Sequence, residues 1–238
     1  MSAIAPAGPA TVPAPAAAGV PARRWLARFT LTERALHWVH ATAFVTLLGS
    51  GLVLYLPPLS ELVGRRPLVK DIHWWTAISW AGALALIVLV GNRRAVARTV
   101  REIDAFDADD RRFLRGQRPA PQGRFNAGQK VNAILTAAFA LLFAVSGALL
   151  WLGERNHAFR LEGTVFLHDA LMYVSLVLLV GHLYLAVINP KTRHALHGMT
   201  RGTVDEEWAR VHHAKWVAEL EAARTTDGAV SPVDQNAT

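Results

Sequence analysis

Residues 165–188 read VFLHDALMYVSLVLLVGHLYLAVI. This run is apolar enough to cross a bilayer, whose hydrocarbon core of about 30 Å is spanned by roughly 20 helical residues. It nevertheless contains His168 and His182, which are fourteen residues apart. At about 1.5 Å of rise per residue and 3.6 residues per turn, the two imidazoles share one helix face at depths about 21 Å apart. A polar ring is costly in hydrocarbon unless a partner engages it, so both histidines are functional candidates.

Three more stretches have the length and hydropathy of membrane spans. The chain has 238 residues, 52% of them hydrophobic, and the apolar residues are clustered rather than dispersed. The sequence therefore predicts an all-α integral membrane protein, a four-helix bundle followed by a short C-terminal amphipathic helix. Besides residues 165–188, the expected spans are residues 36–56, 72–91 and 130–151.

The two ends of the chain differ in composition from the spans. Residues 1–22 are rich in Ala and Pro and lack the apolar core of a signal peptide, so we expect them to be disordered. Residues 23–190 form the expected four-span domain, and residues 191–238 form a polar cytoplasmic tail. The chain has no Cys, which excludes disulfides, thiolate metal sites, Cys-ligated iron–sulfur clusters and covalently attached c-type haem.

The distribution of Lys and Arg predicts the orientation of the spans. Twenty of the 25 lie before the first span, between the second and third spans, or in the tail, and five lie in the two other loops. The positive-inside rule then places both termini and residues 92–129 in the cytoplasm. Because the charge follows the expected topology, the net charge of +7 does not call for a nucleic-acid partner.

The histidines sort into two depths. With this orientation, His73 begins its span on the outer side, at the depth of His168. His37 and His40 begin the first span on the cytoplasmic side, near the depth of His182, and spacing alone leaves both open as its partner. Two opposed imidazoles in a four-helix bundle suit the axial ligation of a haem b. The pattern therefore predicts two haems at two depths.

These histidines have other candidate roles. A single membrane histidine is often an interhelical hydrogen bonder or lies at headgroup level, and a proton relay would not require matched pairs. A zinc site is weaker, because no Cys and few acidic residues accompany the histidines. A cofactor-free transporter or sensor would leave the paired depths unexplained. The remaining histidines are expected to be solvated or interfacial: His157, His194, His197, His212 and His213.

The chain resembles the gamma subunit of respiratory formate dehydrogenase, a membrane di-haem cytochrome b of the cytochrome b561-like group. The resemblance covers roughly residues 28–218. The His-Trp pair and the two histidines of the last span are shared with hydrogenase and thiosulfate reductase membrane subunits, whereas NAGQK and the tail are more specific. The motifs are RFTLTERALHWVH (28–40), DIHWW (71–75), GRFNAGQKVN (123–132), LHDALMYVSLVLLVGHLYLAV (167–187) and HGMTRGTVDEEWARVHHAKW (197–216).

This resemblance implies the ligand set of each haem. The outer haem would be held by His73 and His168. The inner haem would be held by His182 and by His37 rather than His40, because the family's ligand directly precedes a Trp, as His37 does here.

The resemblance also implies a quinone site beside the inner haem, formed by Asn126, Gly128 and Gln129. The two amides can donate hydrogen bonds to a quinone oxygen, and the glycine lets a flat ring approach the backbone. The same residues are also a good helix start, with Asn126 as N-cap.

The implied function is electron transfer in a bacterial inner (plasma) membrane. An iron–sulfur (beta) subunit on the outer side, fed by a molybdenum or tungsten catalytic (alpha) subunit, would pass electrons through both haems to menaquinone or ubiquinone. This chain would not oxidise formate itself. A hydrogenase or another reductase could use the same subunit type.

Two further segments are candidate contacts. Residues 57–71 either dock the iron–sulfur subunit or form a solvated loop. Residues 204–221 are expected to form one short helix with Trp208 and Trp216 near one face, either at the membrane interface or against a partner.

Overall fold

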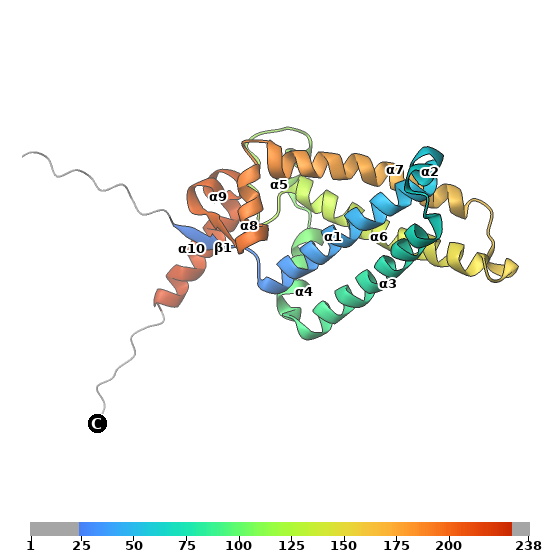
Figure 1. The fold of residues 1–238 in the computed structure, drawn as a ribbon. Helices are drawn as coiled ribbons and strands as arrows, with labels where there is room; N and C mark the ends of the chain where they lie inside the picture. Colours follow the sequence, from blue (N-terminus) through green and yellow to red (C-terminus); the bar gives the residue numbers. More distant parts are fainter. Residues whose placement is uncertain (1–23, 230–238) are drawn as a thin grey trace, which may run out of the picture.

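The computed structural model describes residues 24–229. Within this range four helices are long and apolar enough to cross a membrane, which confirms the predicted all-α, multi-pass architecture. Helix α1 packs on α3, α6 packs on α7, and α1 also contacts α7. Figure 1 shows all four extending between the two ends of the molecule, with α1 crossing α6 in this view. The helices are α1 (Leu31–Tyr55), α3 (Arg66–Val90), α6 (Ala127–Gly153) and α7 (Thr164–Leu183), with α7 continued by the π-helical turn η2 (Tyr184–Ile188).

Helices α1 and α6 begin before the residues that hydropathy predicts, because capping residues, not apolar residues, set their starts. In α1, Thr30 accepts a bond from the Glu33 amide while the Glu33 carboxylate accepts from Thr30. In α6, Asn126 and Gln129 form the same reciprocal arrangement. Each capping box satisfies amide groups that the first helical turn leaves without an intrahelical partner.

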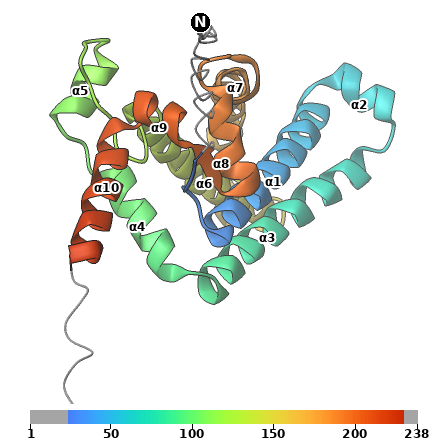
Figure 2. The same ribbon diagram turned by 90° about the vertical axis from the view of Figure 1, so that its left-hand side faces the viewer.

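The two ends of the bundle are built differently (Figures 1 and 2). One end carries only short connections, α2 (Pro57–Val63) and the 3-10 turn η1 (His157–Phe159). At the other end lie the polar segments, which we call the cap (residues 24–30, 92–126 and 189–229). The cap contains β1 (Trp25–Ala27), α4 (Arg93–Asp104), α5 (Ala108–Leu114), η3 (Arg193–Ala195), α8 (Leu196–Arg201), β2 (Thr203–Asp205), α9 (Glu206–His212) and α10 (Ala214–Ala229).

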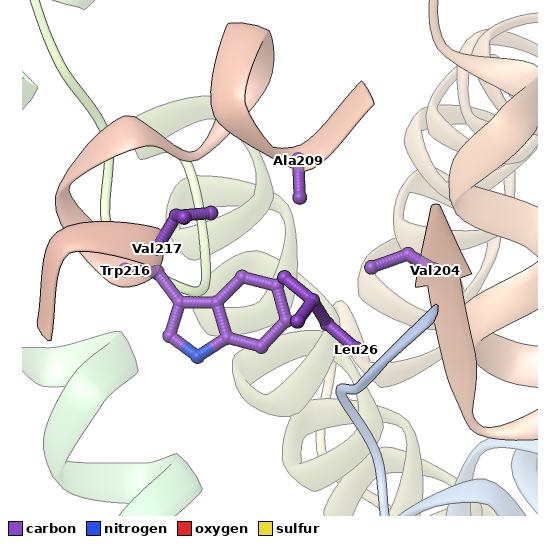
Figure 3. Close-up of a cluster of buried hydrophobic side chains, with 5 residues drawn as sticks. All are labelled: Leu26, Val204, Ala209, Trp216 and Val217. Carbon is purple, nitrogen blue, oxygen red and sulfur yellow. The ribbon is translucent and has the colours of Figure 1, made fainter. Parts of the chain in front are cut away.

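The cap has a small apolar core of its own. Strand β1 pairs antiparallel with β2, with Leu26 opposite Val204. The buried side chains of Ala209, Trp216 and Val217 cluster with this pair, as Figure 3 shows. The segment before α1 is therefore joined to the tail by a sheet. The predicted domain boundary at residue 190 stays a prediction, and the expected disorder of residues 1–22 lies outside the described residues.

The prediction of a single tail helix over residues 204–221 is wrong. The segment starts in β2 and its helix is interrupted at His213, whose backbone is non-helical with φ −140° and ψ 45°. The interruption lets α10 fold back, and Trp216 is buried in the cap core instead of at a membrane interface. His213 was expected to be solvated or interfacial, yet it is only 1% exposed, and its Nδ1 lies 2.7 Å from the Gly123 carbonyl.

Candidate functional site

His73 of α3 and His168 of α7 face each other at the end of the bundle that carries α2 and η1. Their ring centroids are 6.3 Å apart and the rings are inclined by 64°. We call them the loop pair. The two residues that the sequence assigned to one depth are thus brought together from two different helices.

Each ring of the loop pair contacts a serine on the neighbouring helix. Ser50 Oγ of α1 lies 2.9 Å from Nδ1 of His73, and Ser146 Oγ of α6 lies 2.8 Å from Nδ1 of His168. Sequence reasoning missed both serines. The signal that could have located them is the dipeptide Ser-Gly, which occurs at residues 50–51 and again at 146–147.

The glycine of each dipeptide lies beside the same ring. A Cβ atom on Gly51 would be 3.6 Å from Cε1 of His73, and a Cβ on Gly147 would be 3.6 Å from Cε1 of His168. These are contact distances, so a side chain at either position would fill the space next to the imidazole. The two glycines therefore leave the space beside each ring open.

The second pair lies at the cap end. His37 of α1 and His182 of α7 have ring centroids 6.3 Å apart and an inclination of 49°. We call them the cap pair. Nδ1 of His37 is buried and has no hydrogen-bond partner among the described residues.

The structure distinguishes His37 from His40, which spacing did not. The ring of His40 packs against Trp80 at 5.7 Å and Phe44 at 5.9 Å between centroids. It is His37 that stands opposite His182.

Both pairs have the separation that a shared iron atom requires. A metal–imidazole nitrogen bond is about 2.0 Å long and the nitrogen lies about 1.1 Å from its ring centre, so two opposed ligands of one metal have centroids about 6 Å apart. The pairs meet this distance at two places along α7. No group of three or more His, Asp or Glu side chains within residues 24–229 is placed to hold a bare metal ion. The residues therefore fit haem better than zinc.

The predicted quinone residues form the start of α6. Asn126 Oδ1 accepts from the Gln129 amide at 2.9 Å, and Gln129 Oε1 accepts from the Asn126 amide at 3.1 Å and from Arg28 at 3.3 Å. The side-chain oxygens of Asn126 and Gln129 therefore both accept hydrogen bonds within the helix cap. The two side-chain amide nitrogens donate to none of the residues that the structure describes. Gly128, between them, is exposed.

A largely buried ion cluster anchors this region to the first turn of α1. Arg124 bonds to Glu33 at 2.8 Å and to Glu102 at 2.6 Å, and its Nη1 also donates to the Arg28 carbonyl. Arg28 is itself buried, and burial together with the charge of Arg124 lowers its pKa to about 9. The carboxylates of Glu33 and Glu102 offset part of the cost of placing two guanidinium groups side by side.

Comparison with known proteins agrees with this geometry. A sequence profile of the prokaryotic cytochrome b561 family matches residues 28–202. The formate dehydrogenase cytochrome b556(fdo) subunit of Escherichia coli K12 is 26% identical over 205 residues, covering 83% of this chain and 94% of that protein.

Two further relatives have related names. The nitrate-inducible formate dehydrogenase cytochrome b556(Fdn) subunit of the same organism is 22% identical, covering 84% of this chain and 94% of that protein. The formate dehydrogenase cytochrome b556 subunit of Haemophilus influenzae is 24% identical, covering 81% and 82%. The profile match spans most of the chain and includes all four membrane helices and both histidine pairs. This multi-pass membrane protein therefore belongs to the prokaryotic cytochrome b561 family.

Proposed function

We propose that this chain is the membrane cytochrome b subunit of a formate dehydrogenase, and that it carries electrons through two b haems to a quinone. The observation that carries the proposal is the pair of facing histidine sets, each with ring centroids 6.3 Å apart. The names of the three relatives indicate the electron donor, because all three are formate dehydrogenase subunits. A cytochrome b subunit of a hydrogenase or another reductase would use the same histidines, but the relatives favour formate.

The histidines would hold the two cofactors at fixed places along α7. His73 and His168 would supply the axial nitrogens of one haem, and His37 and His182 those of the other. Bound haem iron supplies one-electron exchange between its ferric and ferrous forms. The protein determines ligand identity, orientation and dielectric, and its apolar spans keep water away from the rings.

The cap is proposed to be cytoplasmic, because most Lys and Arg residues lie in its segments. The loop pair then lies near the outer face, beside α2. An iron–sulfur subunit with a molybdenum or tungsten catalytic partner would dock over Pro57–Val63 and the start of α3. Lys70 is exposed there and pairs with Glu154 at 2.7 Å, so this surface already carries charge of both signs.

Menaquinone or ubiquinone is proposed to bind near the cap pair, against the start of α6. The amide nitrogens of Asn126 and Gln129 would donate to a quinone oxygen, and exposed Gly128 would admit the ring. Quinone reduction consumes protons, and an ion pair between Lys130 Nζ and Asp110 Oδ2 at 2.7 Å lies beside this site. Both side chains are buried, and in the proposed orientation this charged pair would lie on the cytoplasmic side of the bundle.

The test is a reduced-minus-oxidised optical spectrum with a pyridine haemochrome assay on the purified full-length chain, expressed with an adequate haem supply. The expected result is two b haems per chain. The electron donor is tested separately by co-purification with a formate-oxidising partner. A folded, monodisperse chain without haem would overturn the cytochrome assignment and favour a transporter or sensor.

A further inference from the structure

We propose that Ser50 and Ser146 are positioning residues that hold both imidazoles of the loop pair in the Nδ1–H form and lower the reduction potential of the haem bound there. This inference rests on the proposed function. It concerns how hydrogen bonds to the two histidines set the reduction potential of the haem, which the identity of the ligands alone does not determine.

The hydrogen-bond directions follow from counting protons. A serine hydroxyl has one proton, and Ser50 Oγ lies 2.7 Å from the Thr46 carbonyl, which can only accept. Ser146 Oγ stands likewise 2.7 Å from the Leu142 carbonyl. With the hydroxyl proton used for the carbonyl, each oxygen accepts from the imidazole Nδ1–H, which at His73 also has the Leu47 carbonyl as an acceptor. The remaining nitrogen, Nε2, is then unprotonated and available to a metal.

A serine in an apolar helix often bonds to the carbonyl one turn earlier and does nothing more. Two observations separate these serines from that case. Both hydroxyls also reach a histidine on the adjacent helix, at 2.9 and 2.8 Å. The arrangement is also built twice, from α1 onto α3 and from α6 onto α7. By contrast, the buried hydroxyl of Ser175 on α7 has no hydrogen-bond partner in the described part of the chain.

The cap pair lacks this support at His37, whose buried Nδ1 has no partner within residues 24–229. A hydrogen-bond acceptor on the far nitrogen makes an imidazole a more basic ligand, which favours the oxidised metal. The serines therefore lower the potential at the loop pair, while His37 receives no matching contribution. The resulting difference favours electron movement from the loop pair to the cap pair.

The experiment is a spectroelectrochemical titration of the full chain with both haems bound. The variants are Ser50→Ala, Ser146→Ala and the double substitution. The loop-pair wave is identified as the one that disappears in His168→Ala. Each single alanine variant should shift that wave upward, the double variant should shift it further, and the cap-pair wave should not move.

Two further sets of variants separate hydrogen bonding from packing. Ser50→Cys and Ser146→Cys keep the volume but offer sulfur, a poor acceptor, so both should shift the wave as alanine does. Ser50→Thr and Ser146→Thr keep the hydroxyl and should leave it near the wild-type potential. Thr46→Val is the matched control, because it removes an α1 hydroxyl that bonds only to the Thr42 carbonyl, and it should move neither wave.

The outcomes are distinct. Two haems at unchanged potentials in the alanine and cysteine variants would overturn the serine inference and leave the haem assignment intact. A shift in the alanine variants that the cysteine variants do not reproduce would also overturn it, because packing would then be the cause. A wild-type chain without haem would overturn both proposals.

Discussion

Arg124 and Glu33 form a buried ion pair, with Nη1 and Oε1 2.8 Å apart and both side chains less than a tenth exposed. The pair joins the segment before α6 to the first turn of α1. It thereby holds together two of the places where the cap meets the bundle, close to the proposed quinone residues and to His37.

Removing Arg124 is expected to destabilise the protein strongly. Arg124→Ala leaves Glu33 buried without its cation, and breaking a buried pair from one side costs about 3–5 kcal/mol. Lys70→Ala is the control, because it breaks an ion pair of which both members are about half exposed, worth about 1 kcal/mol or less. Thermal unfolding followed by circular dichroism in one detergent should show a much larger drop in Tm for Arg124→Ala. Equal drops would contradict the structural role of the buried pair.

The buried His213 predicts a loss of cap stability in mild acid. Burial, with the nearby charge of Arg28, lowers the pKa of His213 from its ordinary 6.5 to about 3. The unfolded chain therefore binds a proton at a higher pH than the folded chain does. Folding loses stability as the pH falls from about 6.5 toward about 3, and keeps it above 6.5.

The measurement is Tm at pH 7.5 and at pH 5. His213→Gln should reduce the fall in Tm between these two values, because glutamine does not titrate. His212→Gln should keep the wild-type fall, since this neighbouring ring is less buried and stacks on Trp208. The same fall in Tm in the wild type and both variants would show that protonation of His213 does not cause the loss of stability in acid.

Substituting either histidine of a pair should remove the same single haem. His73→Ala and His168→Ala should each lose one of two haems, and His37→Ala and His182→Ala should each lose the other. His40→Phe is the control, because His40 packs among aromatic rings and should leave two haems. Haem content by pyridine haemochrome decides this. A haem lost from His40→Phe and kept in His37→Ala would reassign the cap pair.

Gln129→Glu tests the proposed quinone donor without removing the helix cap. The carboxylate can still accept from Asn126 and Arg28, as the glutamine oxygen does, but it cannot donate from an amide. Loss of one hydrogen bond of about 1 kcal/mol should weaken quinone affinity by roughly fivefold. The measurement is KM for a soluble quinone, with haem content and Tm as controls for folding. An unchanged KM would remove Gln129 from the site.

The membrane spans and the depths of the histidines could be predicted because both depend on local properties. Hydropathy over about 20 residues marks a span, and the helical repeat places His168 and His182 on one face whatever surrounds them. The ends of the spans were less accurate, since capping pairs such as Thr30 and Glu33 extend α1 beyond its apolar stretch. The tail prediction was wrong because Trp216 is buried in one cluster with Leu26, which lies far away in the chain.

The sequence by itself determined four apolar helices and the heights of their histidines, because helix pitch and hydrophobic length act along the chain. Tertiary structure decided which rings meet and what supports them. Only the packing of α1 against α7 places His37, and not His40, opposite His182. Only the pairing of α1 with α3 and of α6 with α7 brings Ser50 and Ser146 to Nδ1 of His73 and His168. Such contacts join residues distant in sequence, and no periodicity within a single helix encodes them.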